Sequence, residues 1–260
     1  MAIGLALIFG LRLPVNFTSP YRARSMIEFW RCWHITLSNF LRDYVYIPLG
    51  GSRAKLLRIT FNLMAVMLAG GLWHGASWTF VVWGGIHGIA LSINHALRVL
   101  KINFNLPAIF ILPAMFFYLN FTWVFFKAET FGSAMRILRG MVGMNDVIIP
   151  QPYEDKLSLL MPILEPVLAF DFVYFGDVPL YENNTQIIQY VAILAIIWFL
   201  PNTLQWTGYN KVTAAGKIPK NFMKRFPFSL SPFYAVLMAI LALSSVVFMY
   251  HGQQFLYFQF

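Results

Sequence analysis

The feature that most restricts the fold is an apolar stretch of 39 residues, Ile59 to Leu97, that contains no Lys, Arg, Asp or Glu. A transmembrane helix needs about 20 such residues. Basic residues flank the stretch, with Arg58 before it and Arg98 after it. Because Lys and Arg collect on the cytoplasmic side of a membrane, we expect two short arms that enter and leave from that side. We place the bend between them at Gly70-Gly71 and the following His-Gly-Ala-Ser, at membrane depth.

The composition of the whole chain fits a multi-pass membrane protein. Of its 260 residues, 59% are hydrophobic and 11% are charged, whereas soluble domains have about 25% charged residues. The net charge of +9 is unevenly distributed, since residues 12–58 and 211–225 are basic and residues 146–182 are acidic. This alternation is typical of membrane topology. We therefore expect membrane lipids as partners and no nucleic acid.

The remaining segments predict an all-α architecture. Residues 1–10 are apolar but too short to span, so we expect them to be the tail of a helix whose beginning the chain lacks. The other expected spans and loops are residues 106–126 running outward, 146–182 as an external loop with short interfacial helices, 187–200 returning, 211–225 as a cytoplasmic loop and 233–250 as the last span.

Residues 26–46 are expected to form one helix at the membrane surface, because four charged residues are too many for a simple span. Ser25 and Glu28 have the spacing of a helix-capping box at its start. On a helical wheel, His34 lies between an apolar stripe and a polar stripe.

The polar stripe beside His34 contains Arg31, Ser38 and Arg42. Two interpretations of His34 stay open. It can be a boundary residue that hydrogen-bonds a neighbour, or it can lie on the wall of a cavity where Arg31 and Arg42 meet an anionic ligand. Cys32, the single cysteine, points about 100° away from such neighbours on a helix, so we do not expect it to act as a nucleophile.

His74 lies in the middle of the uncharged stretch, far in sequence from any titratable residue. An ionisable group at membrane depth indicates a functional site, although a neutral histidine can also donate to a carbonyl freed by a bend. The pairs Gly71/Gly75 and Gly84/Gly88 have the spacing that lets helices approach closely. No carboxylate or second cysteine accompanies the histidine, so no metal site is expected.

Two motifs together resemble the membrane-bound O-acyltransferase (MBOAT) family: "FWRCWHITLSNFLRDYVYIPLGG" and "GLWHGASWTFVVWGGIHG". They are most similar to its bacterial alginate O-acetyltransferase branch, with the D-alanyl transferases of teichoic acid modification as relatives. The resemblance implies a single membrane domain over residues 1–260, with re-entrant or interfacial helices around a central cavity. Family members are longer, so the chain corresponds to their C-terminal portion.

The resemblance also implies a function. It predicts an enzyme of the bacterial inner membrane that moves an acetyl group toward hydroxyls of an exported polysaccharide such as alginate. The histidine of the family's WHG motif is catalytic, which is His74 here, and that of the WHxxLS motif is a second functional position, His34. Imidazole is suited to remove a hydroxyl proton near neutral pH. The substrate contacts that we expect are Arg31, Ser38, Asn39, Arg42, Asp43, Trp73 and Trp78.

No tightly bound cofactor is expected, because the acyl donor is a co-substrate. Acetyl-CoA or an acyl-carrier protein can approach the basic cytoplasmic face, and the resemblance implies a periplasmic acetyl-transfer protein as a further partner. Two alternatives stay open. The chain can be a transporter or channel whose helix is broken at Gly70–Gly75, or an inactive fragment of an acyltransferase.

Overall fold

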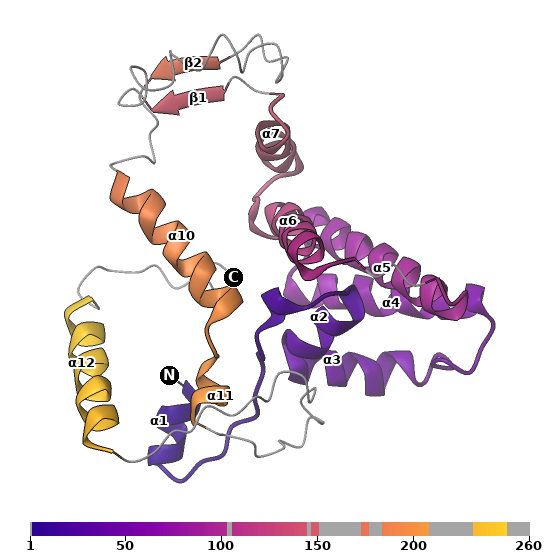
Figure 1. Ribbon diagram of the computed structural model, residues 1–260. Helices are drawn as coiled ribbons and strands as arrows, with labels where there is room; N and C mark the ends of the chain where they lie inside the picture. Colours follow the sequence, from indigo (N-terminus) through magenta and orange to yellow (C-terminus); the bar gives the residue numbers. More distant parts are fainter. Residues whose placement is uncertain are drawn as a thin grey trace. The chain divides into compact units, whose positions relative to one another are not determined.

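The computed structural model describes residues 2–102, 106–144, 147–150, 173–176, 184–207 and 231–248. The chain divides into two compact units, one of Met1–Pro20, Trp30–Asn39 and Pro201–Phe260, the other of Tyr21–Phe29 and Phe40–Leu200. Figure 1 shows the elements of both. That residues 1–260 act as one membrane domain stays a prediction.

Three helices of the second unit are long and apolar enough to cross a membrane: α4 (Leu56–His74), α5 (Trp78–Val99) and α6 (Ala108–Lys127). At 1.5 Å per residue, α4 is about 28 Å long, close to the thickness of a bilayer's hydrocarbon core. Large apolar side chains such as Leu57 and Phe110 are exposed along them, as expected where lipid replaces water. The predicted multi-pass helical architecture is confirmed.

The uncharged stretch folds as a hairpin in which α4 and α5 lie side by side (Figure 1). The predicted position of the bend is confirmed for His-Gly-Ala-Ser, residues 74–77, and is wrong for Gly70-Gly71. Helix α4 continues through Gly70 and Gly71 and ends at His74, and α5 begins at Trp78. Each arm therefore has the length of a full span, and neither is a short re-entrant arm.

The glycines of the hairpin lie where α4 and α5 pack closely against each other. A Cβ atom on Gly71 would collide with the carbonyl oxygen of Phe80, and one on Gly84 would collide with that of Met67. A Cβ on Gly88 would lie 2.7 Å from Sδ of Met64. The predicted close approach at small residues is thus confirmed for these three glycines.

The predicted continuous helix over residues 26–46 is also wrong. The structure has α2 (Met26–Cys32), α3 (Ile35–Leu41) and a π-helical turn η2 (Arg42–Tyr46). The chain breaks at His34, whose φ of +41° is left-handed. Residues 16–18 bind to this break, because Thr18 N donates to Cys32 O and Ile35 N donates to Asn16 O, each over 3.0 Å.

The predicted cap at the start of α2 is confirmed in part. The Ser25 hydroxyl accepts a hydrogen bond from Glu28 N over 3.2 Å. The Glu28 carboxylate accepts from Arg24 N over 2.8 Å, one residue before the cap. The Ser25 hydroxyl thereby satisfies one of the orphan amides at this helix start.

Beyond α6, the second unit continues with α7 (Phe131–Met141), which starts at a capping box formed by Thr130 and Ser133. Strands β1 (Val147–Pro150) and β2 (Val173–Gly176) then pair in parallel. They fall inside the predicted external loop and were not predicted as strands. The rest of that loop, which is residues 146, 151–172 and 177–182, lies outside the described residues.

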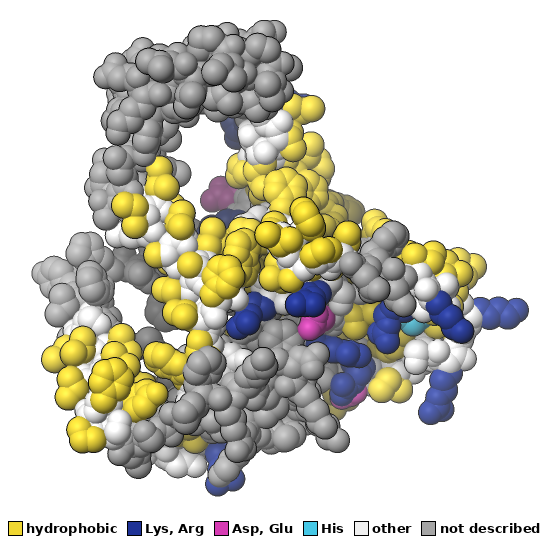
Figure 2. Space-filling model, in the orientation of Figure 1, with side chains coloured by type: hydrophobic (Ala, Val, Ile, Leu, Met, Phe, Trp, Pro, Cys, Tyr) yellow, Lys and Arg dark blue, Asp and Glu magenta, His cyan; other side chains and the backbone are white. Residues whose placement is uncertain are grey.

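The C-terminal segments are helical as predicted. They form α10 (Asn184–Phe199) in the second unit, and α11 (Thr203–Thr207) and α12 (Pro232–Phe248) in the first, which also contains α1 (Ala2–Ile8). Hydrophobic side chains cover α10 and α12 in Figure 2. With 16 and 17 residues, α10 and α12 are shorter than a typical span. The predicted cytoplasmic loop 211–225 lies outside the described residues.

Candidate functional site

His74 is the last residue of α4 and is 8% exposed. The helix ends there because Gly75 adopts a φ of +153° that residues with a side chain rarely adopt. The next helix starts immediately, since the Ser77 hydroxyl accepts from Thr79 N over 3.3 Å and caps α5. The local sequence thus places His74 at the turn of a hairpin between two spanning helices.

Four aromatic rings surround the imidazole of His74, and we call these four residues the aromatic cage. Trp73 and Phe126 each lie edge-on with ring centroids 4.8 Å from that of His74. Trp83 is perpendicular to it at 5.5 Å, and Phe80 is tilted at 6.1 Å. Because the cage comes from α4, α5 and α6, three spanning helices fix the position of this ring.

Behind the cage, Trp83 is also in contact with His87, with centroids 4.8 Å apart. His87 is fully buried, and its Nε2 lies 3.1 Å from the hydroxyl of Thr122 on α6. That hydroxyl donates to Leu119 O over 2.8 Å. Since a hydroxyl has one proton, His87 Nε2 is the donor to Thr122. His87 is therefore a packing residue.

The surroundings of His34 belong to the other compact unit. Its carbonyl accepts from Ser38 N over 2.9 Å, so it caps α3. Asn16 Oδ1 accepts from both the backbone N and the hydroxyl of Thr36, over 3.0 and 2.6 Å. Burial lowers the pKa of the His34 imidazole below its ordinary value of 6.5, because desolvation disfavours the charged form. The ring is therefore mostly neutral at pH 7.

The substrate contacts predicted near His34 stay predictions, but the helical pattern that grouped them is absent. Because α2 and α3 are separate helices, the helical wheel that grouped Arg31, Ser38 and Arg42 no longer applies. Ser38 donates its hydroxyl proton to Trp33 O over 3.1 Å. Arg42 forms a two-pronged ion pair with Asp43 over 2.7 and 3.1 Å.

This ion pair is about half exposed, and the guanidinium of Arg42 lowers the pKa of the Asp43 carboxyl. Arg31 is exposed on α2, whereas Asn39 is half-buried on α3. Near His74, Trp73 is 58% and Trp78 is 79% exposed. Trp73 belongs to the aromatic cage, and the substrate contacts predicted for Trp73 and Trp78 stay predictions.

Three residues of the candidate site were missed by the sequence reasoning: Phe80, Trp83 and Phe126. Phe80 and Trp83 lie three positions apart on α5, which is one turn of a helix, in the stretch that follows His74. That spacing was a usable signal. Phe126 lies 52 residues from His74, and nothing local in the sequence connects it to the imidazole. Within the described ranges, no group of three or more His, Cys, Asp or Glu side chains is placed to hold a metal ion.

The chemistry available at the cage is proton transfer. A buried imidazole with aromatic walls can take a proton from a hydroxyl in a site that contains little water. The rings of the aromatic cage carry no charge, so they pack around the histidine without forming an ion pair with it.

Comparison with known proteins adds a family to this geometry. The sequence profile of the family described as "MBOAT, membrane-bound O-acyltransferase family" matches residues 1–135. The matched range includes His34, His74 and the whole aromatic cage.

Among individual proteins, the chain is 52% identical over 178 residues to a peptidoglycan O-acetyltransferase of Helicobacter pylori, covering 67% of this chain and 33% of the relative. It is 45% identical over 160 residues to a probable alginate O-acetylase of Azotobacter vinelandii, covering 62% and 32%. A probable alginate O-acetylase of Pseudomonas syringae is 33% identical over 275 residues, covering 100% and 52%. The chain thus spans about a third to a half of the length of these relatives.

Proposed function

Because the chain belongs to the membrane-bound O-acyltransferase family, we propose that it carries the acyl-transfer centre of a membrane O-acetyltransferase, with His74 as the general base. The observation that carries the proposal is the burial of His74 at the end of a spanning helix, among aromatic rings from three such helices. This arrangement holds an imidazole at a fixed position in an apolar setting, which is what proton abstraction from a hydroxyl requires.

The proposed reaction transfers an acetyl group from a thioester to a hydroxyl. An imidazole nitrogen of His74 takes the hydroxyl proton while the hydroxyl oxygen forms a bond to the thioester carbonyl carbon. The tetrahedral intermediate then breaks its carbon–sulfur bond, and the departing sulfur takes the proton from His74. The aromatic cage limits the water that would otherwise hydrolyse the thioester. We propose acetyl-CoA or an acetylated carrier protein as the donor of this thioester.

His34 is proposed as a second functional group of the same reaction. Two observations support this role besides its motif: a left-handed backbone conformation, of the kind that collects at functional sites, and a neutral imidazole that can donate and accept hydrogen bonds. Arg42 is already paired with Asp43, so the exposed Arg31 is the better candidate to bind an anionic acyl donor.

The acceptor is proposed to be a hydroxyl of an exported or cell-wall polysaccharide, reached from the inner membrane of a bacterium through a periplasmic acetyl-transfer protein. Relatives named for peptidoglycan and for alginate both support a polysaccharide. Helix α4 is unbroken through Gly70 and Gly71 but ends at His74, just before Gly75, so this turn alone does not favour the transporter alternative over the acyltransferase.

The deciding experiment expresses the protein in a bacterial strain that lacks its own polysaccharide O-acetyltransferase. Mild base releases ester-linked acetate from purified peptidoglycan and from alginate, and the acetate is then quantified. We expect His74→Ala to reduce it at least about 100-fold, the usual effect of losing a general base. The polysaccharide that gains acetate identifies the acceptor.

His95→Ala is the matched control, because His95 lies on α5 outside the aromatic cage. It should leave acetylation unchanged, with the amount of each variant in the membrane checked by immunoblot. Full acetylation by His74→Ala would contradict the assignment of the general base. Absence of acetylation by the unaltered protein would contradict the proposed activity.

A further inference from the structure

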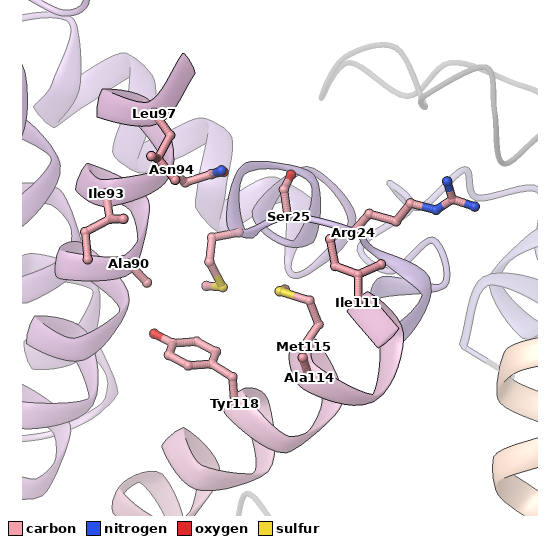
Figure 3. A pocket seen from close by; sticks show the side chains of 11 residues that line it. Arg24, Ser25, Ala90, Ile93, Asn94, Leu97, Ile111, Ala114, Met115 and Tyr118 are labelled. Atoms are coloured by element: carbon pink, nitrogen blue, oxygen red, sulfur yellow. The ribbon is translucent and has the colours of Figure 1, made fainter. Parts of the chain in front are cut away.

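A groove of about 360 Å³ opens between the start of α2 and the helices α5 and α6 (Figure 3). Its volume falls in the range of small-molecule sites, about 300–1,000 Å³. The walls are mainly apolar, with Ile93 and Leu97 on α5 facing Ile111 and Met115 on α6. Neither His74 nor any other predicted site residue lines it, so it is separate from the candidate active site.

The polar groups in the walls of the groove are largely used by the fold itself. The Ser25 hydroxyl accepts from Glu28 N, and Asn94 Oδ1 accepts from Ile27 N, each over 3.2 Å. The Tyr118 hydroxyl donates to Ile86 O over 3.1 Å. What remains for a ligand is an apolar channel with one charged group, Arg24.

The guanidinium of Arg24 lies at the rim of the groove and extends away from its centre (Figure 3). It is exposed, and no side-chain hydrogen bond or ion pair to it is found among the described residues. The nearby Glu28 carboxylate instead accepts from the backbone N of Arg24. A cation without a partner at the mouth of an apolar groove suits a ligand with an anionic head and an apolar tail.

The groove also lies at the basic end of two spanning helices. It is lined by the second half of α5 and the first half of α6. Arg98 lies in the last turn of α5, and Lys101 comes just after that helix. By the positive-inside rule this end faces the cytoplasm. The cytoplasmic leaflet is rich in anionic lipid, which basic residues near the membrane surface attract.

We propose that this groove binds one anionic phospholipid, with an acyl chain between α5 and α6 and its phosphate on Arg24. The lipid fills the apolar channel and neutralises the charge at its rim. It thereby joins the start of α2 to the α5–α6 pair, so the site stabilises the connection between the surface helix and the membrane helices.

The test uses protein purified in nanodiscs that contain equal amounts of phosphatidylglycerol and phosphatidylcholine. Native mass spectrometry then measures which lipid stays bound to the protein after the protein is released from the nanodisc. We expect one phosphatidylglycerol to be retained in preference to phosphatidylcholine. Arg24→Gln should reduce this preference about fivefold, the effect of one basic residue near an anionic headgroup. Arg53→Gln, an exposed arginine outside the groove, is the control.

A second variant tests the apolar channel. Ala114 is an exposed lining residue on α6, so Ala114→Phe should fill the groove without disturbing the core and should abolish retention of the lipid. Ile109→Phe, on the same helix outside the groove, should retain it. Equal retention of both lipids by the unaltered protein, or retention that neither Arg24→Gln nor Ala114→Phe changes, would overturn the proposal.

Discussion

The ring of Phe126 meets the ring of His74 edge to face, with centroids 4.8 Å apart and planes at 79°. His74 is the last residue of α4, and Phe126 is the next-to-last residue of α6. Trp83 of α5 contacts both rings, at 5.5 and 5.3 Å. The orientation of the candidate general base therefore depends on the packing of three helices at one end of the bundle.

Replacing Phe126 with leucine should lower kcat without changing KM. The variant removes an edge-to-face contact worth about 0.5–1.5 kcal/mol, so the imidazole spends less time in its productive orientation and the rate falls about 3- to 10-fold. Initial rates of acetate transfer measure both constants. Phe117→Leu, at an exposed position of α6, should leave both unchanged. An equal kcat for the two variants would contradict the positioning role of Phe126.

The close contact of α4 with α5 predicts opposite effects at two adjacent glycines. Gly84→Ala should destabilise the protein by about 1–3 kcal/mol, because its Cβ would collide with the carbonyl oxygen of Met67. At Gly85 the nearest atom to an added Cβ is Leu68 Cδ2 at 3.9 Å. Gly85→Ala should therefore be neutral or stabilise the helix by up to about 1 kcal/mol. Thermal unfolding in detergent, followed by circular dichroism, compares the two, and equal melting temperatures would exclude this packing.

The sequence allowed the α4–α5 hairpin to be predicted, because charge distribution and apolar length act locally along the chain. Where α4 ends before the bend could not be predicted in the same way. Gly70 and Gly71 look like helix breakers in isolation, but Gly71 is needed where α5 crosses α4. Glycine occurs both at turns and at helix crossings, and the contact with a partner helix determines which of the two a given glycine forms.

The break at His34 and the cage around His74 were missed for a related reason. Residues 26–46 have a continuous helical pattern, but the hydrogen bonds of Asn16 and Thr18 to the break come from a loop more than ten residues earlier. Phe126 likewise reaches His74 from another helix. Contacts between segments that are distant in sequence leave no periodic signal, so a single sequence does not reveal them.

The hydrogen bond from His87 to Thr122 predicts that a Thr122 variant that keeps the hydroxyl will be more stable than one that removes it. Thr122→Val keeps the shape but leaves the buried His87 Nε2 without its acceptor, which should cost about 1–3 kcal/mol. Thr122→Ser keeps the hydroxyl and should cost less than half as much. Chemical unfolding in detergent measures both free energies. If Thr122→Val were as stable as Thr122→Ser, the assigned hydrogen bond would make no net contribution.

The stability of the protein should depend on the residue at position 34 and, through His34, on pH. Its φ of +41° is accessible to glycine and asparagine but unfavourable for a β-branched residue. We therefore expect His34→Val to lower the free energy of unfolding by about 1–2 kcal/mol relative to His34→Gly, measured by chemical unfolding at pH 7.5. Equal stability of these two variants would contradict the left-handed conformation.

The pH dependence follows from the lowered pKa of His34. Because the unfolded chain, with a pKa near 6.5, binds the proton more readily than the folded protein, stability is full above that pH and falls as the pH drops toward the folded pKa. His34→Asn tolerates the same backbone conformation and cannot titrate, so part of this acid-induced decrease should vanish. Melting temperatures of the unaltered protein and of His34→Asn between pH 7.5 and 5 provide the measurement. Parallel curves for the two proteins would show that His34 does not titrate in a buried setting.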